Sequence, residues 1–223
     1  MKIETTKKLF YNKWLFKIEL TEPGICYLKR LSLEDIKNMS VRNFANRLHN
    51  RAVDNKENIL KIAFFLEDAK LEHDFVTRAE GDTLNIYTND TSLLEKVQLR
   101  FPKKFLRLWQ PKSIVEQSFL EKNNNVIICK KLPNQGFRFK SYISSLEKIS
   151  RNTTDQFLKW TENYSDSIII PRATKELFTG SYRGYCFNNY LYVKDPKTLM
   201  MVTMYLGNAI SRTEQYVLDT EIV

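Results

Sequence analysis

The strongest constraint on the fold is an internal repeat. Residues 32–36 read SLEDI and recur as SLEKI at residues 145–149, an offset of 113 (145 − 32 = 113). Residues 84–90 resemble residues 190–195 at an offset of 105, which aligns the two central tyrosines (192 − 87 = 105). A repeat of this length indicates that one structural unit occurs twice in the chain.

Each copy opens with a predicted β-hairpin, because apolar and β-branched runs flank a turn that contains Pro and Gly. In the first copy the arms are residues 14–20 and 25–28. In the second copy they are residues 126–129 and 137–140.

Helical segments follow each hairpin, at residues 41–53 and 56–70 in the first copy and at residues 153–164 in the second. A second hairpin is predicted next, with its turn at residues 80–82 in one copy and at residues 188–189 in the other. Gly, Asn and Asp tolerate the left-handed backbone that such turns require.

Each copy closes with a capped helix and a short strand. Asp90 and Asp195 are the expected N-caps, since an Asp side chain accepts hydrogen bonds from the first backbone N–H groups of a helix. The strands are expected at residues 105–109 and 213–218. The sequence therefore predicts an α+β fold of two tandem diverged ββαββαβ units, ferredoxin-like or related. We expect hairpin-rich antiparallel sheets with helices on one face, and units that span residues 1–112 and 113–223.

The chain is basic, with 35 Lys and Arg residues against 26 Asp and Glu residues, a formal net charge of +9 and a pI near 9.3. This balance fits a partner with negative charge, most often nucleic acid. An anionic membrane surface, or solubility alone, is the alternative, because the charge is spread along the chain.

Three features predict an intracellular protein in a reducing compartment. No apolar stretch approaches the ~18 residues of a membrane span, and the N-terminus lacks the apolar core and cleavage site of a signal peptide. Cys26, Cys129 and Cys186 are an odd number without a CxxC spacing, which argues against a disulfide framework and a zinc site. We expect them to be small buried hydrophobic residues. No Gly-rich phosphate loop is present, so no P-loop or Rossmann site and no cofactor are predicted.

A basic helical segment at residues 41–51 is one candidate nucleic-acid site. Four of its polar side chains share the face opposite the apolar positions, and a further arginine lies beside them; the five are Arg42, Asn43, Arg47, Asn50 and Arg51. Arg and Asn suit phosphates and base edges. The alternative is an ordinary solvent-exposed face.

Basic and aromatic residues also alternate in two strand-like runs. Residues 182–190 resemble the strand motif of RNA-recognition domains, in which Lys/Arg-Gly leads into aromatic residues that stack on bases. Arg183 and Tyr185 are the candidates there, unless these aromatic residues are core. In residues 137–140, Arg138 and Lys140 would share one strand face.

The densest acidic group lies near the end of a predicted helix, and it consists of Glu67, Asp68, Glu72 and Asp74. A two-metal nuclease needs carboxylates that converge from several elements, and the second copy lacks a matching group. Neither His49 nor His73 has a partner at metal-ligand spacing. We therefore expect a solvated loop or strand edge at His73, and no metal site.

Phrases in the second copy resemble uncharacterised proteins encoded by viruses and phages. They are residues 131–133 with 137–140 and residues 192–195 with 199–201, and the resemblance covers mainly residues 126–206. It implies a viral origin but brings no known function.

The leading hypothesis is a non-enzymatic nucleic-acid-binding protein. Its phosphate contacts would come from the arginines and the lysine named above, with Tyr182 or Tyr185 available for stacking. A structural or assembly component, for example of a virion, is the first alternative. A metal-dependent nuclease is the second.

Overall fold

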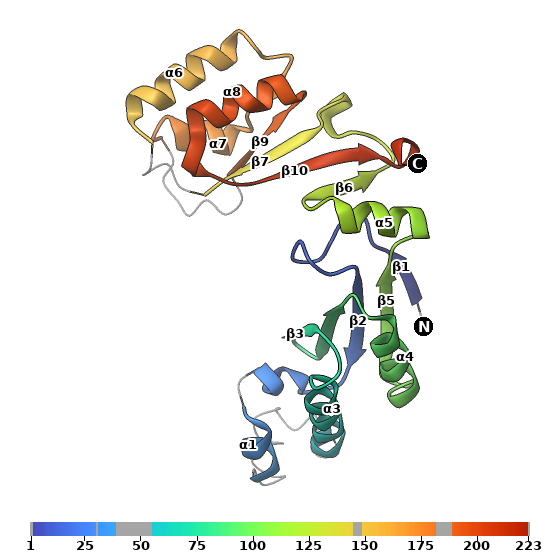
Figure 1. Cartoon of the computed structure of the whole chain (residues 1–223). Coiled ribbons are helices and arrows are strands. Elements are labelled where there is room, and N and C mark those ends of the chain that lie inside the picture. Colours follow the sequence, from blue (N-terminus) through green and yellow to red (C-terminus); the bar gives the residue numbers. More distant parts are fainter. Residues whose placement is uncertain (1, 30, 39–54, 145–148, 182–188, 223) are drawn as a thin grey trace. The chain divides into compact units, whose positions relative to one another are not determined.

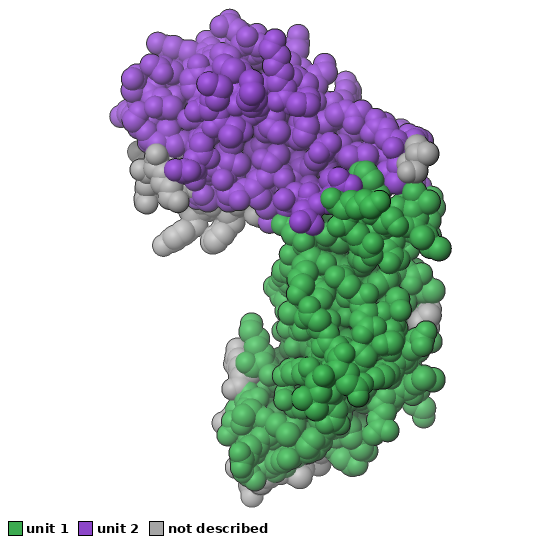
Figure 2. Space-filling model, viewed as in Figure 1, with its two compact units in different colours: residues 1–122 green, residues 123–223 purple. Residues whose placement is uncertain are grey.

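The computed structural model describes residues 2–29, 31–38, 55–144, 149–181 and 189–222. The chain divides into two compact units, unit 1 (Met1–Lys122) and unit 2 (Asn123–Val223), coloured separately in Figure 2. The division falls after Lys122 and not after Lys112, because helix α5 (Ile114–Lys122), which the sequence pattern did not predict, belongs to unit 1.

Unit 1 contains a five-stranded sheet in the order β1-β5-β2-β4-β3. Strands β1 and β5 are parallel, and the other neighbours are antiparallel. Besides α5, its elements are β1 (Lys2–Thr5), β2 (Phe16–Thr21), the 3-10 helix η1 (Ile25–Lys29), α1 (Leu33–Asn38), α3 (Asn55–Ala69), β3 (Phe75–Glu80), β4 (Thr83–Thr88), α4 (Thr91–Arg100) and β5 (Phe105–Gln110).

Unit 2 contains a second five-stranded sheet in the order β6-β10-β7-β9-β8, again with one parallel pair, β6 and β10. Its elements are β6 (Val126–Cys129), η2 (Pro133–Gln135), β7 (Phe139–Ile143), α6 (Arg151–Glu162), β8 (Ile168–Ile169), α7 (Arg172–Phe178), β9 (Asn189–Val193), α8 (Pro196–Leu206), η3 (Gly207–Ala209), β10 (Ile210–Leu218) and η4 (Asp219–Glu221).

The two sheets have the same topology strand for strand, since β1 to β5 take the places that β6 to β10 take in unit 2. In each unit the last four strands form an antiparallel sheet in the ferredoxin-like order; unit 1 joins them as βαββαβ, and unit 2 adds α7 between β8 and β9. The predicted fold class, two tandem α+β units of ferredoxin-like type, is therefore confirmed. The sheets are mixed because the first strand of each unit adds to the edge in parallel.

The hairpin predicted at the start of each copy is wrong. In unit 1, residues 25–28 form part of η1, because Ile25 N–H bonds to the carbonyl of Glu22 (3.0 Å) and closes a local turn. In unit 2, β6 and β7 are both present, but β10 lies between them. The second hairpin of unit 1, β3 to β4, is confirmed. The turn predicted at residues 188–189 falls largely outside the described residues, and β9 instead pairs with β7 and β8.

The predicted N-caps are confirmed. Asp90 Oδ1 accepts a hydrogen bond from the backbone N–H of Ser92 (2.8 Å) at the start of α4. Asp195 Oδ1 accepts one from the N–H of Thr198 (2.9 Å) at the start of α8, with Pro196 at the first helical position. Both caps satisfy N–H groups that a helix start leaves without an intrahelical partner.

In unit 2 the helices cover one face of the sheet (Figure 1). Their side chains pack on alternate residues of the central strands, and the buried cluster comprises Phe139, Ile143, Phe157, Ile168, Phe178, Leu191, Val193, Val202, Leu206 and Ala209. Because successive strand residues point to opposite faces, Lys140, Tyr142, Tyr190 and Tyr192 lie on the other face.

Cys26 and Cys129 are half-buried and not fully buried as predicted, and the Cys129 thiol lies 3.5 Å from the carbonyl oxygen of Val217; Cys186 is outside the described residues. No described helix is both long enough and apolar enough to span a membrane.

Candidate nucleic-acid interface

The face of the unit 2 sheet that lies opposite its helices carries a cluster of tyrosines and charges. Register places two rows across the strands, Glu214–Lys140–Tyr192 and Arg212–Tyr142–Tyr190. Tyr216 follows Glu214 by two residues on β10 and shares the face. We call this surface the tyrosine face, and it consists of Lys140, Tyr142, Tyr190, Tyr192, Arg212, Glu214 and Tyr216.

Lys140 lies among the tyrosine rings. Its Nζ is 3.9 Å from the ring centroid of Tyr190, 4.8 Å from that of Tyr142 and 5.7 Å from that of Tyr192. Lys140 makes no ion pair with a described residue. Cation–π attraction of this kind is worth ~0.5–2 kcal/mol, so it holds the ammonium over the rings.

Glu214 positions the neighbouring groups. It is buried (6% exposed), and its Oε2 accepts a hydrogen bond from the hydroxyl of Tyr142 (2.9 Å). Arg212 lies over the Tyr142 ring, 4.1 Å from its centroid, with Nη2 3.8 Å from Glu214 Oε1. The carboxylate thus fixes Tyr142 and leaves the exposed guanidinium of Arg212 at the edge of the face.

Burial raises the pKa of Tyr192 and that of Tyr216 above the ordinary value of 10.0. The rings of Tyr142, Tyr190 and Tyr192 remain partly exposed. They therefore present aromatic surface to a ligand.

Helix α7 anchors the strand that carries two of these rings. The buried hydroxyl of Thr174 donates to the carbonyl oxygen of Tyr190 (2.9 Å), and the backbone N–H of Tyr190 donates to the same hydroxyl (3.2 Å). Both groups point to the side where β8, only two residues long, does not reach. The Thr174 side chain thus makes the two hydrogen bonds that a neighbouring strand would otherwise make to the backbone of Tyr190.

Unit 1 repeats part of this constellation. Register there gives the rows Trp109–Lys17–Tyr87 and Arg107–Glu19–Asn85. With the strands matched in order, Lys17, Tyr87 and Arg107 occupy the places of Lys140, Tyr192 and Arg212. Tyr87 and Arg107 are related to their counterparts by one offset (192 − 87 = 105, 212 − 107 = 105).

On the corresponding face of unit 1, the charged side chains pair with one another. Glu19, 6% exposed, pairs with Lys17 Nζ (2.6 Å) and Arg107 Nε (2.8 Å), and accepts from Trp109 Nε1 (3.2 Å).

Aromatic rings from the segment before β2 cover the same face. The rings of Phe10 and Tyr11 pack on Tyr87, with centroid distances of 5.4 and 4.9 Å. Tyr87 is only 6% exposed. Of the two matched faces, that of unit 2 is the one that offers rings to a ligand.

Most sequence-predicted site residues lie outside the described part of the chain; they are Arg42, Asn43, Arg47, Asn50, Arg51, Arg183 and Tyr185. Lys140 lies on the tyrosine face. Arg138 instead binds Glu221 through two N–H···O bonds of 2.9 and 2.6 Å. Sequence reasoning missed Tyr142, Tyr192, Arg212 and Tyr216. Alternation within 140–142 and 190–192 is the signal that predicts a shared strand face.

The acidic group does not converge. Glu67 pairs with Lys70 (2.7 Å), Glu72 with Lys96 (2.5 Å) and Asp74 with Lys13 (2.9 Å), while Asp68 is exposed. No group of three or more potential metal ligands occurs among the residues that the structure describes.

His73 is not solvated as predicted. Its side chain is 6% exposed, with Nδ1 2.5 Å from Asp90 Oδ2 and Nε2 2.9 Å from Lys96 Nζ. The Asp90 carboxylate that caps α4 therefore also holds this ring.

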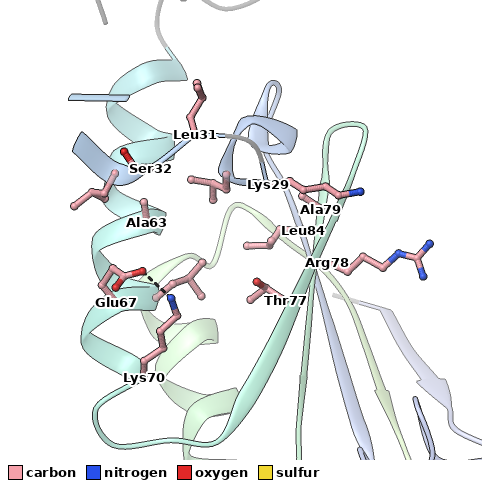
Figure 3. A pocket seen from close by; sticks show the side chains of 13 residues that line it. Lys29, Leu31, Ser32, Ala63, Glu67, Lys70, Thr77, Arg78, Ala79 and Leu84 are labelled. Carbon is pink, nitrogen blue, oxygen red and sulfur yellow. Dashed lines mark hydrogen bonds and ion pairs between the residues drawn. The ribbon is translucent and has the colours of Figure 1, made fainter. Parts of the chain in front are cut away.

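A cavity of about 270 Å³ lies beside the Glu67–Lys70 pair, between η1, α3 and β3 (Figure 3). Apolar side chains such as Leu31 and Leu84 line it, and the Arg78 side chain points away from it. Glu67 and Lys70 neutralise each other there, and Lys29 is a further charged residue of the lining.

Comparison with protein-family models, with curated proteins and with solved structures found no match to this chain.

Proposed function

We propose that the protein binds single-stranded nucleic acid, without catalysis, on the tyrosine face of unit 2. The observation that carries the proposal is the set of partly exposed rings of Tyr142, Tyr190 and Tyr192 on two central strands, with the Lys140 ammonium among them.

The chemistry of this face suits unstacked bases. Stacking on an aromatic ring is worth ~1–3 kcal/mol per base and tolerates any sequence. Sheets with aromatic residues on adjacent central strands serve this purpose in RNA-recognition domains, which stack two or three bases. This likeness is an analogy of fold, and the proposal rests on the side chains of the tyrosine face themselves.

The charges suit the backbone of the same strand. Lys140 and the exposed Arg212 carry positive charge on the face, against one buried carboxylate, Glu214. Phosphate contacts release counterions and so make affinity depend on salt. A duplex keeps its bases stacked inside, so it cannot use the rings.

An assembly role is the second candidate, and it rests on a different surface. Met200 and Met204 lie four residues apart on α8 and are 58% and 73% exposed. Residues at this spacing share a helix face, and exposed methionines favour contact with other proteins.

The first test is a fluorescence-anisotropy titration of the full chain with short labelled single strands and duplexes of RNA and DNA, at low and at physiological salt. The proposal predicts tighter binding of a single strand than of its duplex, weakened by salt. Absence of binding at low salt would contradict it, and static light scattering would then test for a defined oligomer.

A further inference from the structure

Strand β3 forms one edge of the unit 1 sheet, and its outer side carries unpaired backbone groups. Among the described strands it pairs with β4 alone, in a regular register without a bulge. Glu80 and Thr83 close the two-residue turn of this hairpin and so exchange backbone hydrogen bonds. Because the pattern alternates along the strand, Phe75, Thr77 and Ala79 direct their N–H and C=O groups outward. These groups have no hydrogen-bond partner among the residues that the structure describes.

A hollow lies beside this edge on each face of the sheet. On the helix side it is the cavity of about 270 Å³, which Thr77 and Ala79 border (Figure 3). On the opposite side a hollow of about 520 Å³ lies beside Val76 and Arg78. Lys29 borders both hollows, so it lies at the edge itself. Successive side chains of a strand added to β3 would point into the two hollows in turn.

The helix-side cavity suits apolar side chains. Facing β3 across it are half-buried leucines from η1 and the residues that follow, namely Leu28, Leu31 and Leu33. Its volume lies below the ordinary range for small-molecule sites, ~300–1,000 Å³. It therefore fits the side chains of a peptide better than a whole small molecule.

The excess charge at this edge is positive. Arg78 pairs with Glu80 (2.6 Å) and Lys70 pairs with Glu67 (2.7 Å). Lys29 is exposed and makes no ion pair within the described part of the chain. A partner that carries a carboxylate near its apolar side chains complements this edge.

We propose that an extended, acidic segment of another protein binds here by adding a strand to the outer side of β3. Its backbone pairs with the outward groups of Thr77 and Ala79, its apolar side chains enter the helix-side cavity at every second position, and a carboxylate between them meets Lys29. In this mode of recognition main-chain hydrogen bonds supply affinity, and pockets for alternate side chains supply specificity. The site uses no residue of the tyrosine face, so either proposal can fail without the other.

The test begins with a phage-displayed library of random peptides, each slightly longer than the six residues of β3, selected on the immobilised full chain. The proposal predicts enriched peptides that place apolar residues at every second position with Asp or Glu between them. A selection that yields no binder, or binders without this alternation, would overturn it.

A selected peptide, resynthesised with a fluorescent label, then tests the backbone pairing by anisotropy titration. N-methylation of an amide removes its donor and leaves the side chains unchanged. Methyl groups on one alternate set of residues are expected to weaken binding about tenfold or more, since each removes a hydrogen bond to β3. Methyl groups on the other set face solvent and should cost far less. Equal losses from both sets would show that the peptide does not bind as a strand.

Thr77→Pro removes one outward N–H of β3. The bonds to β4 come from the neighbouring residues, and Pro is tolerated where the N–H of an edge strand faces outward. We therefore expect a folded protein, checked by circular dichroism, that binds the peptide about tenfold or more weakly. The matched control is Thr5→Pro on β1, the edge strand at the other side of the sheet. The N–H of Thr6 bonds to Gln110 (2.7 Å), so that of Thr5 points outward. It should bind as wild type does, and an equal loss would overturn the site.

Lys29→Glu tests the charge, and it decides the matter if Thr77→Pro does not fold. It is expected to weaken the peptide about two- to fivefold, the range for an exposed ion pair. Lys7→Glu makes the same change at an exposed position outside both hollows and should have no effect. Wild-type affinity in Lys29→Glu would contradict the proposal. Static light scattering completes the test, because a dimer that Thr77→Pro dissociates would mean that a second copy of the chain occupies β3 and would overturn the assignment to another protein.

Discussion

The hydroxyl of Thr174 forms hydrogen bonds with both backbone groups of Tyr190, one as donor (2.9 Å) and one as acceptor (3.2 Å). Thr174 is 1% exposed, so water cannot replace it. Helix α7 thereby holds strand β9 at Tyr190. The Tyr190 ring is the one whose centroid lies nearest to Lys140 Nζ.

Thr174→Val keeps the shape of the side chain and removes both bonds. We expect the free energy of unfolding of unit 2 to fall by about 1–3 kcal/mol, the cost of leaving buried backbone groups without partners. Urea unfolding followed by circular dichroism measures it. Thr179→Val, at an exposed position just after the same helix, is the control and is expected to change stability by less than about 0.5 kcal/mol.

Local features of the fold were predictable from the sequence, and long-range ones were not. The caps at Asp90 and Asp195 depend on bonds to residues two or three positions away, so a short window of sequence contains them. Whether β6 pairs with β7 or with β10 depends on residues some 90 positions apart, such as Val126 and Gln215.

In the candidate site, too, local features were predictable from the sequence and long-range ones were not. Alternation identified Lys140 as a strand-face residue, but which side chains meet it is set by register, which brings Tyr190 and Tyr192 from β9. No sequence pattern predicts the role of Thr174, because a helix residue here makes a hydrogen bond that usually comes from a neighbouring strand.

Glu19→Ala tests the closed face of unit 1. It removes the buried carboxylate shared by Lys17, Arg107 and Trp109, which leaves two cations without compensation. We expect a loss of about 3 kcal/mol, the lower end for a broken buried pair because Arg107 is 40% exposed.

Tryptophan fluorescence measures this loss in unit 1 when the unit 2 tryptophan is replaced, in a Trp160→Phe background. Glu4→Ala, which removes a surface pair with Lys2, is the control and should cost less than about 1 kcal/mol. Similar losses in both variants would mean that Glu19 is not a buried organising charge.

Acid should destabilise the protein in part through Glu221. The hydrogen bond from Arg138 lowers the pKa of Glu221 from 4.5 to about 2. The Ser92 hydroxyl, followed by His73, lowers the pKa of Asp90 from 3.8 to about 2. Because both folded-state values lie below the unfolded ones, this stability is present above about pH 4.5 and is lost as the pH falls toward 2.

Glu221→Gln is expected to lower the urea midpoint at neutral pH, and its difference from wild type should shrink as the pH falls from 4.5 toward 2. The control is Asp219→Asn, which changes an acidic residue of the same 3-10 turn that makes no ion pair with a described residue. A difference that persists unchanged to pH 2 would show that Glu221 acts by packing and not by charge.

Lys140→Met tests the phosphate contact and retains an apolar stem among the rings. The slope of log affinity against log salt is expected to become shallower by about 0.7, the value for one phosphate of a single strand. Lys194→Met, at an exposed position one residue beyond β9, should leave the slope unchanged. Equal slopes for Lys140→Met and wild type would remove Lys140 from the interface.

The central claim is that bases stack on the tyrosine face, and paired substitutions at Tyr190 test it most directly. Tyr190→Phe keeps the ring, and Tyr190→Ala removes it. Each variant would be titrated with the preferred single strand, after circular dichroism confirms that it is folded, with Tyr164→Ala, on the opposite side of unit 2 beside Trp160, as the control.

Stacking predicts that Tyr190→Ala weakens binding by about 1–3 kcal/mol, while Tyr190→Phe and Tyr164→Ala bind as wild type does. Wild-type affinity in folded Tyr190→Ala would contradict the account, and so would an equal loss in Tyr190→Phe.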